Sequence, residues 1–126
     1  MSKTNKKKLI LSAREAVGKL FYSMIEGVVP SRKVIDYFPR NVEDRSIKIA
    51  WHALLHYDSD EEMRINDALY AQEQIKYIEF LANILSKGEE LPQNILDEYE
   101  ELYKDTVLPK RYNWWGTLRS LFRFLD

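Results

Sequence analysis

Cysteine is absent from this chain of 126 residues. The absence excludes disulfide bonds, metal sites with thiolate ligands and enzymes that use a cysteine nucleophile. No segment approaches the roughly 18 consecutive apolar residues of a membrane span. The apolar run Leu9-Ile10-Leu11 is also too short for a signal peptide. We therefore expect a soluble, cytoplasmic protein.

Glycine and proline are scarce, with four residues of each. An all-β chain needs more turn residues than this, whereas the bias towards Leu, Ile, Ala, Glu and Lys favours helix. Four scattered glycines cannot form a phosphate-binding loop, and the Walker A, G-x-G-x-x-G and G-x-S-x-G patterns do not occur. Enzymes that depend on these loops, or on a serine at a nucleophile elbow, are therefore excluded.

The residues that are present indicate one helical domain. A content of 45% hydrophobic and 13% aromatic residues argues against disorder, and the length suits one domain. The sequence predicts an all-α, single-domain helical bundle of five main helices plus one short helix, with a flexible basic tail at about residues 1–5. We expect helices from residue 6 to Gly27, at 32–38, at 41–57, at 59–87, from 92 to about 104, and at 114–125.

Short-range signals support these boundaries. Asn41 is the expected N-cap of the helix at 41–57. Ser59 and Glu62 fit the S-x-x-E capping box of the next helix. The apolar stripe of that helix drifts, which indicates either different neighbours at its two ends or a kink near residues 72–74. Gly18, inside the first helix, would allow a close crossing with a neighbouring helix.

The helix expected at 41–57 is the most apolar of the set. Its apolar side chains cover about two thirds of a helical wheel, so it should be surrounded by other helices. One narrow polar stripe remains, and it consists of Arg45, Lys48, His52, His56 and Ser59. We therefore expect this helix at the centre of the bundle, with both histidines on its solvent-facing line.

His52 and His56 lie one helical turn apart, which is the spacing that two imidazoles need to share a metal such as Zn²⁺ or Fe²⁺. Further ligands would come from Asp58, Asp60, Glu61 and Glu62, or from Glu73 and Glu79. The pattern is not a zincin motif, because Ala53 follows the first histidine where that motif has glutamate. The alternative is that the two rings hydrogen-bond to carboxylates of the acidic neighbouring helix.

Charge is distributed unevenly along the chain. Residues 1–50 contain eleven Lys/Arg against five Asp/Glu, residues 51–105 four against fourteen, and residues 106–126 four against one. The basic N-terminal region predicts phosphate contact by Lys6, Lys7, Lys8 and Arg14, as in a nucleic-acid accessory protein. Base reading by a helix-turn-helix is not expected, because the helix at 41–57 lacks a wide polar face.

The segment at 114–125 has a compact aromatic stripe with arginines on its other side. The stripe predicts a closing helix that packs on the protein's own core. The next alternative is a surface for a partner or for oligomerisation, formed by Trp114, Trp115, Leu118 and Phe122. The last is peripheral membrane contact through residues 110–126.

No complete catalytic constellation occurs in the sequence. The first hypothesis is therefore a small helical protein without a cofactor, which acts through protein–protein interaction as an adaptor, regulator or subunit. A homo-oligomer that pairs acidic with basic faces would fit the charge distribution. The alternatives are a nucleic-acid accessory protein and a metal-dependent enzyme or sensor that holds a divalent metal at His52 and His56.

Overall fold

The computed structural model describes residues 3–102. This part of the chain contains six helices and no strand, so the predicted all-α fold class is confirmed. The chain divides into two compact units, Met1–Leu91 and Pro92–Asp126. The helix expected at 114–125, with the partner surface of Trp114, Trp115, Leu118 and Phe122, lies outside the described residues.

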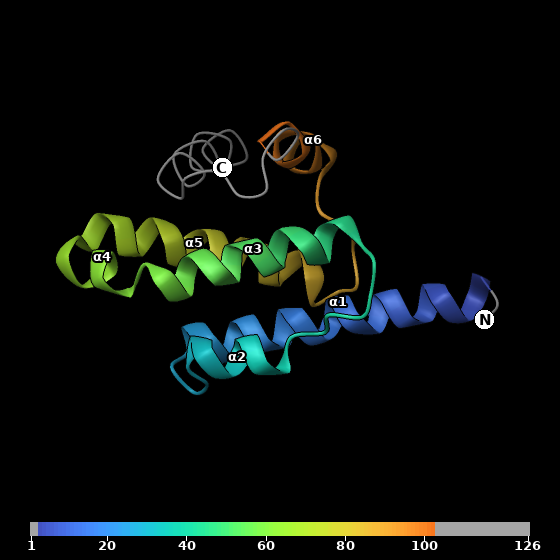
Figure 1. Cartoon of the computed structure of the whole chain (residues 1–126), viewed down its shortest axis with the longest axis horizontal. Coiled ribbons are helices and arrows are strands. Elements are labelled where there is room, and N and C mark those ends of the chain that lie inside the picture. Colours follow the sequence, from blue (N-terminus) through green and yellow to red (C-terminus); the bar gives the residue numbers. More distant parts are fainter. Residues whose placement is uncertain (1–2, 103–126) are drawn as a thin grey trace. The chain divides into compact units, whose positions relative to one another are not determined.

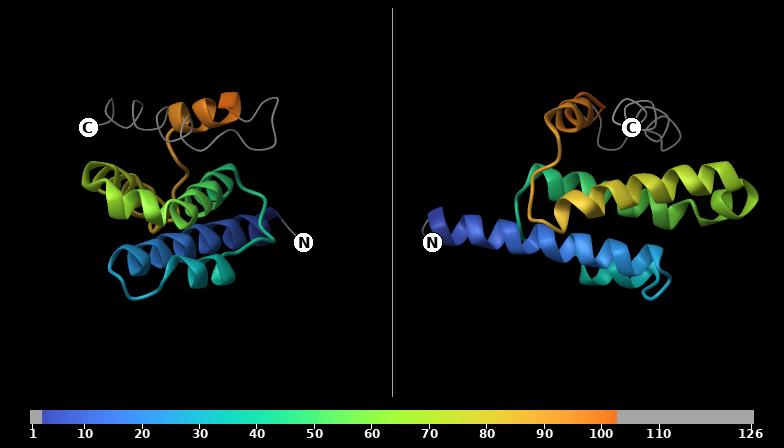
Figure 2. Two further views of the ribbon diagram at one scale, coloured as in Figure 1. Left: turned by 60° about the vertical axis from the view of Figure 1, so that its left-hand side comes forward. Right: turned by 180° about the vertical axis from the view of Figure 1, so that it is seen from behind.

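Five helices belong to the first unit: α1 (Lys3–Ile25), α2 (Ser31–Tyr37), α3 (Arg45–Ser59), α4 (Glu61–Asn66) and α5 (Ala68–Leu85). Figures 1 and 2 show α3 and α5 side by side over a second layer of α1 and α2. α3 contacts each of the other four helices, as expected for a central helix. The core between the layers contains fully buried side chains such as Phe21, Leu54, Ile78 and Leu81.

The most extensive contact in this unit is between α1 and α5. Gly18 makes their close approach possible, because a Cβ atom at this position would lie 2.5 Å from the backbone nitrogen of Ser86. That distance is far below van der Waals contact. The predicted role of Gly18 at a close helix crossing is therefore confirmed.

α1 begins at Lys3, so the helix includes three of the five residues expected in the tail. Every residue from 3 to 9 is exposed, and Figures 1 and 2 show this end of α1 extending past α3 and α5. The other end of the helix follows the prediction. Gly27 adopts φ 78° after the last helical turn, a conformation that glycine takes without steric cost.

The N-cap of α3 is Asp44, and the prediction of Asn41 is wrong. Asp44 has an extended backbone, and its Oδ2 accepts a hydrogen bond of 3.1 Å from the backbone N–H of Ile47. Because α3 starts at residue 45, residues 38–44 form a longer loop than the sequence predicted. This loop forms one side of the groove described below.

The single helix expected at 59–87 is two helices that meet at Asp67. The Oδ1 atom of Asp67 caps α5 by accepting from the backbone N–H of Tyr70 at 3.1 Å. The predicted kink near residues 72–74 is therefore misplaced. The predicted capping box is also wrong, because Asp60 is the N-cap residue of α4 and the hydroxyl of Ser59 donates to the carbonyl of His56.

The described part of the second unit is α6 (Gln93–Leu102). The carbonyl of Pro92 accepts from the backbone N–H groups of Ile95 and Leu96, so the proline opens the helix as predicted. Among the helices of residues 3–102, none combines the length and apolar character that a membrane crossing requires.

Candidate partner-binding groove

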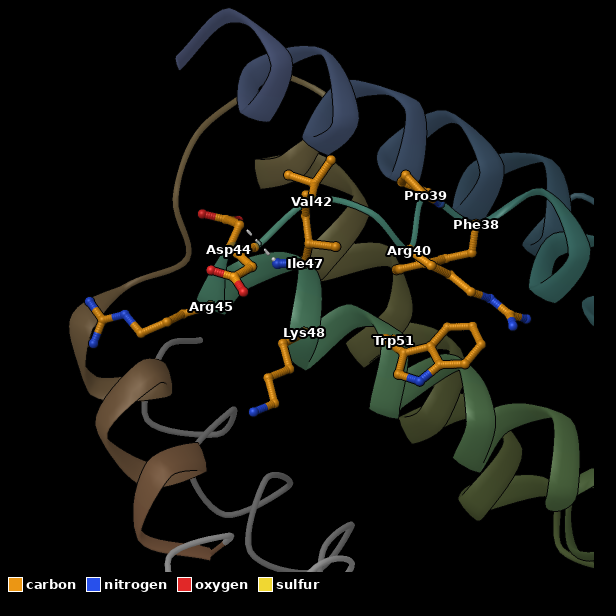
Figure 3. A pocket seen from close by; sticks show the side chains of 10 residues that line it. Phe38, Pro39, Arg40, Val42, Asp44, Arg45, Ile47, Lys48 and Trp51 are labelled. Atoms are coloured by element: carbon orange, nitrogen blue, oxygen red, sulfur yellow. Dashed lines mark hydrogen bonds between the residues drawn. The ribbon is translucent and has the colours of Figure 1, made fainter. Parts of the chain in front are cut away.

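A groove of about 580 Å³ lies between the 38–44 loop and the first two turns of α3 (Figure 3). Its volume falls within the range of about 300–1,000 Å³ that is typical of ligand-binding clefts. The loop contributes Phe38, Pro39, Arg40 and Val42 to the lining, and α3 contributes Ile47, Lys48 and Trp51. The groove is therefore formed by residues that are close in sequence but belong to two different elements.

Helix α2 ends and the 38–44 loop begins just before Pro39. A residue before proline is restricted to extended conformations, and Phe38 at the C-cap of α2 has φ −64° and ψ 133°. The loop then continues to Asp44, where α3 begins. A proline at one end and a capping carboxylate at the other thus determine its length.

Asp44 is held by Arg14 of α1. The Nη2 atom of Arg14 lies 2.7 Å from Oδ1 of Asp44, and Nε lies 3.0 Å from Oδ2. The hydrogen bond with Asp44 raises the pKa of Arg14 above its ordinary value. Nη1 of Arg14 also donates to the carbonyl of Gly88, so one guanidinium joins α1, the start of α3 and the turn after α5.

One side of the groove is formed by the aromatic rings of Phe38 and Trp51 and by the guanidinium of Arg40. The ring centroids of Phe38 and Trp51 are 5.1 Å apart at an interplanar angle of 50°; Phe38 is buried and Trp51 is half-buried. The guanidinium carbon of Arg40 lies 4.6 Å from the centroid of the Trp51 ring. This is a cation–π geometry, and it places a positive charge at an apolar surface.

The remaining charges around the groove are mixed in sign. Asp44 is paired with Arg14, and Arg45 lies 3.3 Å from Glu90. Lys48 is exposed on α3 and lines the groove opposite the loop (Figure 3). Because Asp44 already accepts from the first turn of α3, the helix N-terminus is not an anion site. The other charged residues of the lining are Arg40, Lys48 and Glu43, and all three are exposed, so the two cations outnumber the one carboxylate.

The histidine pair lies further along α3. His56 is buried, so the prediction that both rings lie on a solvent-facing line is wrong for this residue. His52 is half-buried, and burial lowers its pKa to about 4, with smaller contributions from Lys48 and from His56. His52 is therefore neutral at pH 7.

The proposed metal ligands do not come together in the described structure. Within residues 3–102, no group of three or more His, Asp or Glu side chains is arranged to hold a metal ion. Asp58 accepts a hydrogen bond of 2.7 Å from the hydroxyl of Ser31, while Glu61 and Glu62 are exposed on α4. We therefore do not propose a metal site at His52 and His56.

The residues expected to contact phosphate fall into two groups. Lys6, Lys7 and Lys8 are exposed in the first turns of α1. Arg14 is largely buried and is engaged by Asp44 and Gly88, so we leave it out of any phosphate-contacting surface.

Sequence reasoning did not identify the groove. The helical wheel places Trp51 among the apolar side chains of the helix expected at 41–57, and no pattern in the sequence pairs it with Arg40. One available signal is the stretch of five residues between Pro39 and Arg45, which has no helical apolar pattern and ends in a second capping residue, Asp44. If the helix is taken to begin after Asp44 instead of at Asn41, Trp51 falls in its second turn, next to the loop.

Relationships to other proteins do not assign a function. Comparison of the chain with family models, with curated proteins and with solved structures finds no match. The geometry of the described residues is therefore the basis for the function proposed below.

Proposed function

We propose that the protein is a non-enzymatic binding module that takes a segment of a partner protein into the groove between the 38–44 loop and α3. The observation that supports this function is the half-buried Trp51, which is flanked by Phe38 and covered by the Arg40 guanidinium. Tryptophan and arginine are the residue types most often found to dominate binding energy at protein interfaces.

The chemistry of the lining defines the partner segment. An apolar side chain would bury itself against the half-buried Val42 and Trp51, which gains roughly 25 cal/mol per Å² of apolar area. A carboxylate beside that side chain would pair with Arg40 or with Lys48. The expected ligand is thus a peptide segment with an aliphatic or aromatic residue next to Asp or Glu.

The groove is preorganised for such a ligand. The Arg14–Asp44 pair holds one end of the loop, and Arg40 donates to the carbonyl of Ile35 at 3.3 Å near the other end. A surface that is already ordered loses less conformational entropy on binding, so more of the contact energy appears as affinity.

Selection from a displayed library of random peptides tests this function. We expect the wild-type chain to enrich peptides that combine an apolar residue with Asp or Glu, and we expect Lys48→Glu to weaken their binding by roughly ten-fold or more. Lys33→Glu, an exposed change on α2, serves as the control of equal charge. The proposal would be contradicted if the wild-type chain enriched no peptide, or if Lys48→Glu bound the selected peptides as tightly as the wild type.

The first turns of α1 favour a second function, contact with phosphates of a nucleic acid. Lys3, Lys6 and Lys7 have the i, i+3, i+4 spacing that places side chains on one helix face, and residues 3–9 are all exposed. Replacing Lys6, Lys7 and Lys8 by Gln should abolish salt-dependent binding to duplex or single-stranded nucleic acid. Absence of such binding by the wild-type chain would exclude this function.

A further inference from the structure

The junction of α4 and α5 presents an exposed apolar surface. Ile65 is 75% exposed, Leu69 72% and Met63 39%. Single exposed apolar residues are common, but here three of them fall within seven residues of sequence, and we call these three side chains the apolar patch. We refer to residues 61–69 as the α4–α5 tip.

The tip is acidic around this patch. Glu61, Glu62 and Asp67 are exposed. Arg64, the one cation in residues 61–69, faces inward: its guanidinium donates to Oε1 of Gln74 at 2.7 Å and to the carbonyl of Tyr57. It also lies 3.6 Å from the centroid of the Tyr57 ring. The outer surface of the tip therefore combines aliphatic side chains with carboxylates.

A buried network holds the tip in place. Asp60 is 1% exposed, and its Oδ2 atom accepts from the hydroxyl of Tyr70 at 2.7 Å and from Nε2 of Gln74 at 3.2 Å. These bonds connect the start of α4 to the first two turns of α5. The exposed side chains of the tip are thus presented on an ordered backbone.

We propose that the groove of one copy of this chain binds the α4–α5 tip of a second copy. The inference rests on the proposed function of the groove and names its partner. The complementarity is both apolar and electrostatic, because Ile65 and Leu69 match Val42 and Trp51 while the carboxylates of the tip match Arg40 and Lys48, which outnumber the exposed lining carboxylate Glu43.

One chain cannot fill its own groove with its own tip. The groove lies at the start of α3. The tip follows the other end of this helix, and Figure 1 shows α4 at that end. The 15 residues of α3 span roughly 20 Å at about 1.5 Å per residue. The contact is therefore between copies and joins two different surfaces, which makes it a head-to-tail contact that closes into a ring or continues as a chain.

A pair of full-length variants tests this contact. The groove variant is Arg40→Glu with Lys48→Glu, and the tip variant is Ile65→Lys with Leu69→Lys. All four positions are exposed, so the fold should persist, and circular dichroism with thermal unfolding checks that it does. A second tip variant, Glu61→Lys with Glu62→Lys, tests the same surface without changing its apolar residues.

Sedimentation velocity gives the readout. The wild-type chain should show mass that rises with concentration and falls with added salt, and each variant alone should be monomeric, with association weakened roughly a hundred-fold. An equimolar mixture of the groove and tip variants should form a heterodimer and nothing larger, because only one groove and one tip remain intact. Val28→Lys, at a position 72% exposed, is the control and should associate like the wild type.

Each contrary outcome has a defined meaning. A wild-type chain that stays monomeric at all concentrations, variants that still associate, or a mixture that stays monomeric would overturn the second-copy proposal. If displayed peptides still bind the groove in that case, the proposed function stands and only the identity of the partner is wrong. If neither peptides nor a second copy bind, the proposed function fails as well.

Discussion

Arg14 on α1 and Asp44 at the start of α3 form an ion pair with two hydrogen bonds, of 2.7 Å and 3.0 Å, between residues 30 positions apart. The same carboxylate caps α3 through the N–H of Ile47. One side chain therefore sets the first residue of the central helix, the length of the 38–44 loop and the shape of the groove.

Asp44→Ala should lower the free energy of unfolding by about 2–3 kcal/mol, because it removes a helix cap and leaves a largely buried guanidinium without its carboxylate. Asp44→Asn, which can still cap α3, should cost less. Urea unfolding measures both. Equal stability of the alanine variant and the wild type would show that the pair does not hold the loop.

Gly18→Ala should destabilise the protein by about 1–3 kcal/mol, although alanine is the better helix former. The added Cβ would lie 2.5 Å from the Ser86 nitrogen, so α1 and α5 would have to separate. Lys19→Ala, at the next and exposed position, is the control and should change stability by less than about 0.5 kcal/mol. A shift in thermal midpoint of equal size in both variants would contradict the close-crossing argument.

His52 should make stability depend on pH. Its folded pKa is about 4 and its ordinary value is 6.5, so between these values the unfolded chain binds more protons than the folded one. The contribution of His52 to the free energy of unfolding is therefore fully present above pH 6.5 and is lost as the pH drops towards 4. Since the ring is half exposed and screened by solvent, we expect a loss of about 1 kcal/mol. Chemical denaturation at a series of pH values measures this loss, and the free energy of unfolding should vary less with pH for His52→Gln than for the wild type.

Lys48→Glu should raise the pKa of His52, because Lys48 is a positive neighbour that lowers it. The measurement is an NMR titration of the imidazole protons. Lys33→Glu, on α2, should leave the titration midpoint unchanged. An unchanged His52 pKa in the Lys48→Glu variant would mean that the two side chains lie further apart than in the structure.

Tyr70→Phe should cost about 1.5 kcal/mol, since it removes a hydrogen bond to a carboxylate that is 1% exposed. Tyr37→Phe, on a side chain at a position 65% exposed, is the matched control and should be neutral. Chemical denaturation compares the two. If both variants unfold at the same denaturant concentration as the wild type, the Asp60 network does not stabilise the tip.

Local chemistry along the sequence determined much of this fold. The all-α class, the termination of α1 at Gly27 and the opening of α6 at Pro92 all depend on the backbone preferences of single residues or on the spacing of apolar ones. These effects act within a few residues, so a sequence displays them directly.

Tertiary contacts decided the features that form the groove and the tip. Asn41 and Asp44 are both capable caps, and Arg14 from α1 favours Asp44. The chain at 59–87 has a continuous helical pattern, yet Asp67 caps a new helix while Tyr70 and Gln74 hold Asp60. His56 belongs to a polar stripe in the sequence and is buried in the fold. In the first two cases a side-chain partner at least 10 positions away selects among the local alternatives, and such a partner is present only once the helices have packed.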